Sequence, residues 1–78
     1  MNDTETAIKA IQKTIERHKE RENTLRAAAA RAENDTIAAM YDDEIQRNRG
    51  FIDGCRYALG LLEWLRDTPE DMRKEDEA

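Results

Sequence analysis

Very few side chains in this 78-residue sequence could take part in catalysis, and the first of them is its single histidine, His18. The sequence also contains one cysteine, Cys55. A tetrahedral metal site needs several strong ligands, and a catalytic base needs a partner that orients it. Glu22 and Glu44 complete no recognisable set with His18 and Cys55. The sequence therefore predicts no catalytic residue, no metal site and no cofactor, and a protein that is not an enzyme.

The carboxylates are abundant, but their spacing does not form a magnesium site. Helical pyrophosphohydrolases bind magnesium through an E-x-x-E motif paired with an E-x-x-D motif, and this sequence lacks the second motif. We expect His18 to be a buried, hydrogen-bonded residue and Cys55 to be a small core residue.

Four basic residues recur at every fourth position and could bind phosphate groups. This basic ridge consists of Lys9, Lys13, Arg17 and Arg21. Together with the ring of Tyr57, the ridge could enclose an anionic nucleotide between two protomers. The alternative is a solvated helix face whose charge is partly neutralised by neighbouring glutamates.

The most apolar segment runs from Phe51 to Leu65 and contains ten apolar or aromatic residues out of fifteen. The stripe of a single partner helix covers only about a third of a helix circumference, so the remaining side chains need another cover. Exposed apolar patches on small proteins usually mark protein interfaces. The predicted interface residues are Phe51, Tyr57, Leu61, Trp64 and Leu65, together with the acidic run Asp42, Asp43 and Glu44.

Two helices are expected to position these groups, because no glycine or proline occurs before Gly50 and helix-forming residues dominate. Core positions recur at alternating spacings of three and four, which is typical of helices packed lengthwise. The first such row, or seam, is Ile8, Ile11, Ile15, His18, Glu22, Leu25, Ala29 and Ala32. The second seam is Ile37, Tyr41, Ile45, Asn48, Ile52, Cys55, Leu59 and Leu62. The pattern predicts an all-α fold with helices over about 4–33 and 36–66.

A turn near residues 34 and 35 would make these helices an antiparallel hairpin. Asn34 tolerates the left-handed conformation that ends a helix, and Asp35 or Thr36 can cap the next one. Asp3 or Thr4 can cap the first helix, and one unbroken helix through Arg49 is the alternative.

In such a hairpin the numbers of facing residues sum to roughly 69. This register places His18 beside Phe51 and Ile52. It also places Glu22 beside Arg47 and Asn48, which would neutralise a carboxylate in the seam.

All three glycines interrupt the apolar segment. We interpret Gly54 as a clearance opposite Ile15, that is, a position where the missing side chain lets the first helix approach closely. Gly50 either continues that clearance or marks a break in the second helix. Gly60 lies on a polar strip with Asp53, Arg56 and Glu63, and packing does not explain it.

The length allows one domain, with residues 1–67 forming the hairpin and 68–78 a short capped turn and an acidic, flexible tail. A core this small contributes roughly 3–5 kcal/mol, so a homo-oligomeric helical bundle is expected. The net charge of −5 argues against direct DNA binding, and the apolar segment is too short to span a membrane. A lone cysteine is typical of the cytoplasm.

The segment "GFIDGCRYALGLL" resembles the short helical-hairpin proteins of phages and mobile elements, in which a G-x-x-x-G-x-x-x-A-L segment often precedes an acidic tail. This resemblance implies a protein that acts without catalysis in the host cytoplasm. Some proteins of this kind block a host protein by docking on it, and others are oligomeric sponges for a nucleotide signal. Our leading hypothesis is a homo-oligomer that binds and inhibits or modulates a host protein. The alternatives are a nucleotide sponge and a structural or assembly subunit.

Overall fold

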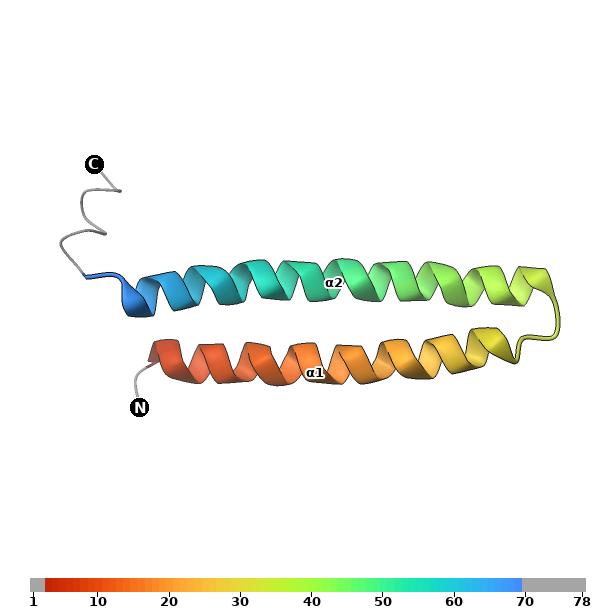
Figure 1. The fold of residues 1–78 in the computed structure, drawn as a ribbon, viewed down its shortest axis with the longest axis horizontal. Coiled ribbons are helices and arrows are strands. Elements are labelled where there is room, and N and C mark those ends of the chain that lie inside the picture. Colours follow the sequence, from red (N-terminus) through yellow and green to blue (C-terminus); the bar gives the residue numbers. More distant parts are fainter. Residues whose placement is uncertain (1–2, 70–78) are drawn as a thin grey trace.

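The computed structural model describes residues 3–69, which form two helices, α1 (Asp3–Ala30) and α2 (Asp35–Asp67). No strand occurs within these residues. The two helices lie side by side and run in opposite directions, with a short connection at one end (Figure 1). The predicted all-α antiparallel hairpin is therefore confirmed.

The core is a single layer between the two seams. Four isoleucines are buried in it, Ile8 and Ile15 from α1 and Ile45 and Ile52 from α2. Asn48 is buried among them, and the remaining seam residues of both helices are half-buried. Because only two helices meet, each seam residue has protein on one side only, and the core is small.

The turn is built differently from the prediction. Asn34 has extended backbone angles, φ −152° and ψ 169°, and its Oδ1 accepts a hydrogen bond of 2.9 Å from the Ile37 N–H. Asn34 itself is therefore the cap of α2, and the predicted left-handed Asn34 with a cap at Asp35 or Thr36 is wrong. The physical reason is that a short polar side chain caps most effectively when its backbone is extended.

Two further boundaries shift. α1 ends at Ala30, short of residue 33, because the N–H groups of Arg31 and Ala32 donate to carbonyls three residues back and tighten the last turn. α1 already includes Asp3 and Thr4, so neither residue is the N-cap that was predicted.

α2 continues without a break through all three glycines. A Cβ added to Gly50, Gly54 or Gly60 would meet no heavy atom within 4 Å outside its own local helix backbone. The alternative of a break at Gly50 is therefore wrong, and so is the interpretation of Gly54 as a clearance opposite Ile15. Gly54 is exposed because it comes one residue before the seam residue Cys55 and so lies beside the seam.

The open space at Gly50 leads to a stability prediction. Gly50→Ala should stabilise the hairpin by about 1 kcal/mol, since alanine loses less conformational entropy in a helix and meets no neighbour here. Thermal unfolding followed by circular dichroism should show a rise of roughly 4–8 °C. The matched reverse change at an exposed alanine of the same helix, Ala39→Gly, should lower the midpoint similarly. A lower midpoint for Gly50→Ala would mean that the glycine is required.

α2 ends at Asp67 and is followed by its C-cap Thr68, whose N–H donates to the Trp64 carbonyl over 2.9 Å. Most of the predicted capped turn, including Asp71 and Met72, and the predicted acidic tail lie outside the described residues. Neither described helix combines the length and the hydrophobicity needed to cross a membrane.

Candidate protein-interaction surfaces

The residues on the two sides of the α2 seam differ in character. From Phe51 onward, the residues that directly precede seam positions form an apolar row of Phe51, Gly54, Ala58 and Leu61, which Leu65 continues one turn farther. Residues that directly follow seam positions form a polar row of Arg49, Asp53, Arg56, Gly60 and Glu63. Because successive residues are rotated by about 100° on a helix, the two rows lie on opposite sides of the seam. The hairpin therefore has an apolar face and a charged face, and Gly60 belongs to the charged one.

The charged face contains a shallow groove that Glu22 helps to line. The groove encloses about 490 Å³ and is lined by Lys19, Glu22, Asn23, Arg49, Ile52, Asp53 and Arg56. Glu22 Oε1 lies 3.1 Å from Arg49 Nε, and its Oε2 lies 3.0 Å from Arg26 Nε. One arginine from each helix thus neutralises this half-buried carboxylate.

Arg49 pairs with Glu22 across the hairpin, where the prediction had Arg47 as the neighbouring arginine. Arg49 follows the seam and so lies on the charged face, where Glu22 lines the same groove, whereas Arg47 precedes the seam and contacts Glu44 at 3.0 Å. A polar partner for Glu22 was expected, but its identity depends on the rotation of each helix about its axis.

His18 is half-buried at the edge of the apolar face, and its contacts there hold the two helices together. Its Nδ1–H donates to the Thr14 carbonyl over 2.9 Å, and its ring stacks on Phe51 with centroids 4.2 Å apart. Asn48 Nδ2 donates to the backbone carbonyl of His18 over 2.7 Å. The predicted proximity of His18 and Phe51 is confirmed, whereas the Asn48 hydrogen bond was not anticipated.

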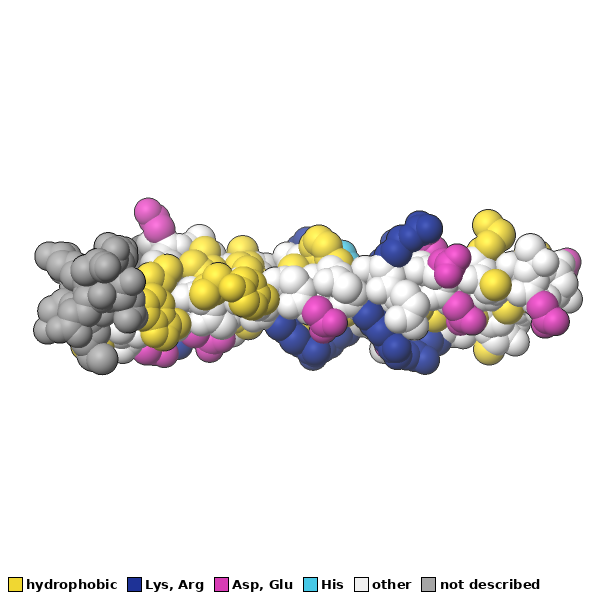
Figure 2. Space-filling view, turned by 90° about the horizontal axis from the view of Figure 1, so that it is seen from above, with side chains coloured by type: hydrophobic (Ala, Val, Ile, Leu, Met, Phe, Trp, Pro, Cys, Tyr) yellow, Lys and Arg dark blue, Asp and Glu magenta, His cyan; other side chains and the backbone are white. Residues whose placement is uncertain are grey.

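Two aromatic residues stand out on the outer side of α2, directed away from α1. Tyr57 is 71% exposed and Trp64 is 43% exposed. They lie seven residues apart, which places them on one helix face two turns from each other. We call them the aromatic crest. Figure 2 shows the hydrophobic side chains gathered over this part of α2, while the basic side chains gather farther along the molecule.

The predicted acidic run is divided by its contacts. Glu44 pairs with Arg21 of α1 at 3.7 Å and with Arg47 at 3.0 Å, so its charge is engaged within the chain. Asp42 and Asp43 are exposed. Only these two carboxylates therefore remain as an acidic surface for a partner.

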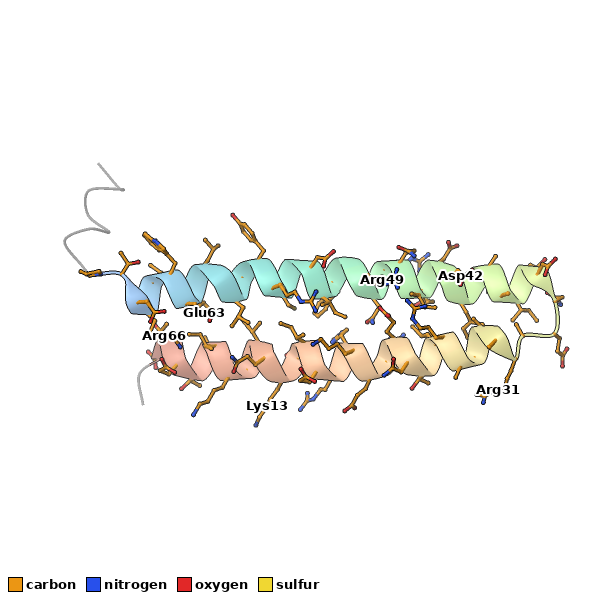
Figure 3. The ribbon with its side chains drawn as sticks, in the orientation of Figure 1. Lys13, Arg31, Asp42, Arg49, Glu63 and Arg66 are labelled. Carbon is orange, nitrogen blue, oxygen red and sulfur yellow. The ribbon has the colours of Figure 1, made fainter. Side chains whose placement is uncertain are left out.

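The basic ridge and Tyr57 are on opposite sides of the hairpin. Lys9, Lys13 and Arg17 line a shallow hollow on α1 alone, and Lys13 points away from α2 (Figure 3). Arg21, the fourth residue of the ridge, is held by Glu44. A single copy thus does not bring the ridge and Tyr57 into one nucleotide site.

The open end of the hairpin carries an ion-pair cluster that the sequence reasoning missed. Arg66 Nη1 lies 3.4 Å from Glu5 Oε1, and Arg66 Nε donates to Asp67 Oδ1 over 2.9 Å. The hydrogen bond from the guanidinium lowers the pKa of Asp67. The residue numbers 5 and 66 fit the predicted register, which is the signal that could have identified this pair.

No group of three or more His, Cys, Asp or Glu side chains is placed to hold a metal ion within residues 3–69. The described geometry offers surfaces for binding, and Tyr57 of the aromatic crest is the most exposed large hydrophobic side chain among the described residues. Protein-family models, curated proteins and solved structures include no match to this chain.

Proposed function

We propose that this chain is a non-catalytic, homo-oligomeric helical protein that binds and modulates a protein partner. The observation that carries this proposal is the aromatic crest, in which Tyr57 and Trp64 are exposed on a continuous helix. Aromatic side chains provide large contact areas at a low entropic cost and dominate the binding energy of many interfaces.

The chemistry of the crest indicates the kind of partner. Seven helical residues separate the two rings by about 10 Å, so the partner would present two apolar pockets at that spacing. Asp43 precedes Tyr57 by fourteen residues and therefore lies on nearly the same helix face. Because Asp42 and Asp43 are exposed and the chain is acidic overall, basic groups beside the apolar pockets would speed association.

The biological setting that we propose follows the sequence resemblance described above. The chain would act in the cytoplasm, as a phage-type accessory or anti-defence factor that occupies a functional surface of a host protein. The lone Cys55 supports a reducing compartment.

The experiment is a comparison of partner recovery by the tagged full chain and a crest variant, Tyr57→Ala with Trp64→Ala, after cross-linking in cells. Loss of two anchor residues should reduce recovery of a specific partner at least about tenfold, since each anchor contributes about 2 kcal/mol. Met40→Ala, which truncates another exposed apolar residue of α2, is the matched control and should leave recovery unchanged. Equal recovery by the crest variant would contradict the proposal.

A further inference from the structure

The apolar row of α2 is part of a larger uncharged face to which both helices contribute. In α1 the residues that precede the first three seam positions are Ala7, Ala10 and Thr14. In an antiparallel pair the preceding positions of both helices fall on the same side, and the stacking of His18 on Phe51 agrees with this arrangement. The uncharged face thus combines these three small residues with the apolar row.

This face is bounded by charge at both ends. The next preceding positions toward the turn are Arg17 and Arg21 in α1 and Arg47 in α2. The opposite end is the C-terminal turn of α2, where the last backbone carbonyls carry partial negative charge and Asp67 is paired with Arg66 at 2.9 Å.

We infer that a second copy of this chain covers the uncharged face, with α2 packed antiparallel on α2 of the partner about a twofold axis between Gly54 and Ala58. The inference rests on the homo-oligomer of the proposed function and names its interface. The aromatic crest lies outside this interface and stays available for another protein.

A second copy would cover the exposed apolar row of α2 permanently. The hairpin buries only four isoleucines, and Phe51, Leu61 and Leu65 of the apolar row remain 49%, 49% and 39% exposed. A core this small rarely stabilises a chain without oligomerisation. A second copy is always present when the protein is made, whereas a transient target is not.

The sizes of the side chains along the apolar row also fit a second copy. The twofold axis places Gly54 of each copy against Ala58 of the other, and Phe51 of each copy against Leu61 of the other. Small residues at the centre let the helix backbones approach closely, and the large side chains fill the space on either side. A Cβ at Gly54 would meet nothing within 4 Å in the single hairpin, so its bare backbone surface is open to a partner helix.

The charges at the ends of the uncharged face and the area of this face are also consistent with a second copy. The same axis brings Arg47 of each copy, which also contacts Glu44 of its own helix, to the last backbone carbonyls of α2 in the other copy. The face spans roughly 20 Å along the helices and roughly 20 Å across them, a flat footprint of about 400 Å² per copy. Protruding side chains increase the accessible area, which brings the total near the lower limit of specific interfaces, about 1,000 Å². A dimer with a micromolar dissociation constant is therefore expected.

Sedimentation equilibrium tests the dimer directly. At about 200 µM, well above a micromolar dissociation constant, the chain should have twice its 9.1 kDa mass. Dilution to well below that constant should return it toward a monomer. A monomer at the high concentration would overturn both this interface and the oligomeric part of the proposed function, and would leave binding by the crest to its own experiment.

A matched pair of glycine substitutions tests the surface. Both Gly54 and Gly60 face open space in the single hairpin, so Gly54→Leu and Gly60→Leu should both keep the helical content of the chain. Gly54→Leu should weaken the dimer at least about tenfold, because it fills the axis, whereas Gly60→Leu on the charged face should change it less than about twofold. A dimer that responds equally to both substitutions would overturn this interface while the oligomer itself would stand.

Disulfide trapping tests the direction of the helices. In a Cys55→Ser background, a Phe51→Cys chain mixed with a Leu61→Cys chain should form the mixed disulfide under oxidised glutathione. The Phe51→Cys chain alone should form little disulfide. Efficient trapping of Phe51→Cys with itself would indicate parallel packing and overturn the antiparallel arrangement.

Discussion

Ile52→Ala is expected to leave the chain largely unfolded at 25 °C. Ile52 is one of only four buried isoleucines, and truncation of a buried isoleucine to alanine costs about 2–5 kcal/mol. That loss is comparable to the whole stability of roughly 3–5 kcal/mol expected for a core of this size. Urea unfolding followed by circular dichroism should show reduced helical signal already without denaturant.

Two companion variants separate core packing from a general sensitivity of α2. Ile52→Val removes one methyl group and should cost only about 0.5–1.5 kcal/mol. Met40→Ala alters an exposed side chain of the same helix and should change the stability by less than about 0.5 kcal/mol. If Ile52→Ala unfolded at the same urea concentration as Met40→Ala, the seam would not be the core of the protein.

The second large effect is expected at Asn48, the buried polar residue of the seam. Its Nδ2 donates to the His18 carbonyl over 2.7 Å, so Asn48→Asp would place a carboxylate against a carbonyl oxygen in a buried position. Two acceptors cannot share a hydrogen bond, and the buried charge is poorly solvated, so a loss of about 3 kcal/mol is expected at pH 7.

The loss should depend on pH in a defined direction. Burial and the facing carbonyl raise the pKa of the new carboxyl in the folded chain above its unfolded value of about 3.9. Below that unfolded value the neutral acid can donate its proton to the His18 carbonyl, and the variant should approach the wild type. As the pH rises through the folded pKa, the deficit should develop fully.

Asn48→Leu is the matched control, because it removes the donor without introducing a charge. Removing one partner of a buried hydrogen bond deprives the His18 carbonyl of this donor, so a loss of about 1–2 kcal/mol without this pH dependence is expected. The measurement is urea unfolding of wild type and both variants at acidic and neutral pH. Equal stability of the two variants at neutral pH would show that the Asn48 hydrogen bond does not determine the packing there.

Much of the fold could be predicted from local pattern. The alternating three-and-four spacing of the full seams identified the buried rows that contain Ile8, Ile15, Ile45 and Ile52, since residues recurring at that spacing share one helix face. The register sum then placed His18 beside Phe51, which the 4.2 Å stacking confirms. The exposed aromatic pair followed from the same reasoning, because a single seam cannot cover a helix that is apolar on most sides.

The errors occurred where the outcome depended on a side chain one position away from the seam. Glu22 meets Arg49 where Arg47 was expected, and Gly54 faces open space where contact with Ile15 was expected. The first error corresponds to two residues, or about 200° around the helix axis, and the second to one residue, or about 100°. Asn34 was a different case, because both its left-handed and its extended conformation are compatible with the sequence, and the hydrogen bond to Ile37 selects the extended one.

The sequence by itself determined two helices, their seams and their approximate register, because these properties depend on the periodicity of side chains along one chain. Only the tertiary structure decided which flank of each seam faces which neighbour, and hence that the three glycines lie outside the core. The physical reason is that helix rotation is set by the combined packing of both seams and by ion pairs such as Glu22 with Arg49, none of which acts within a single helix.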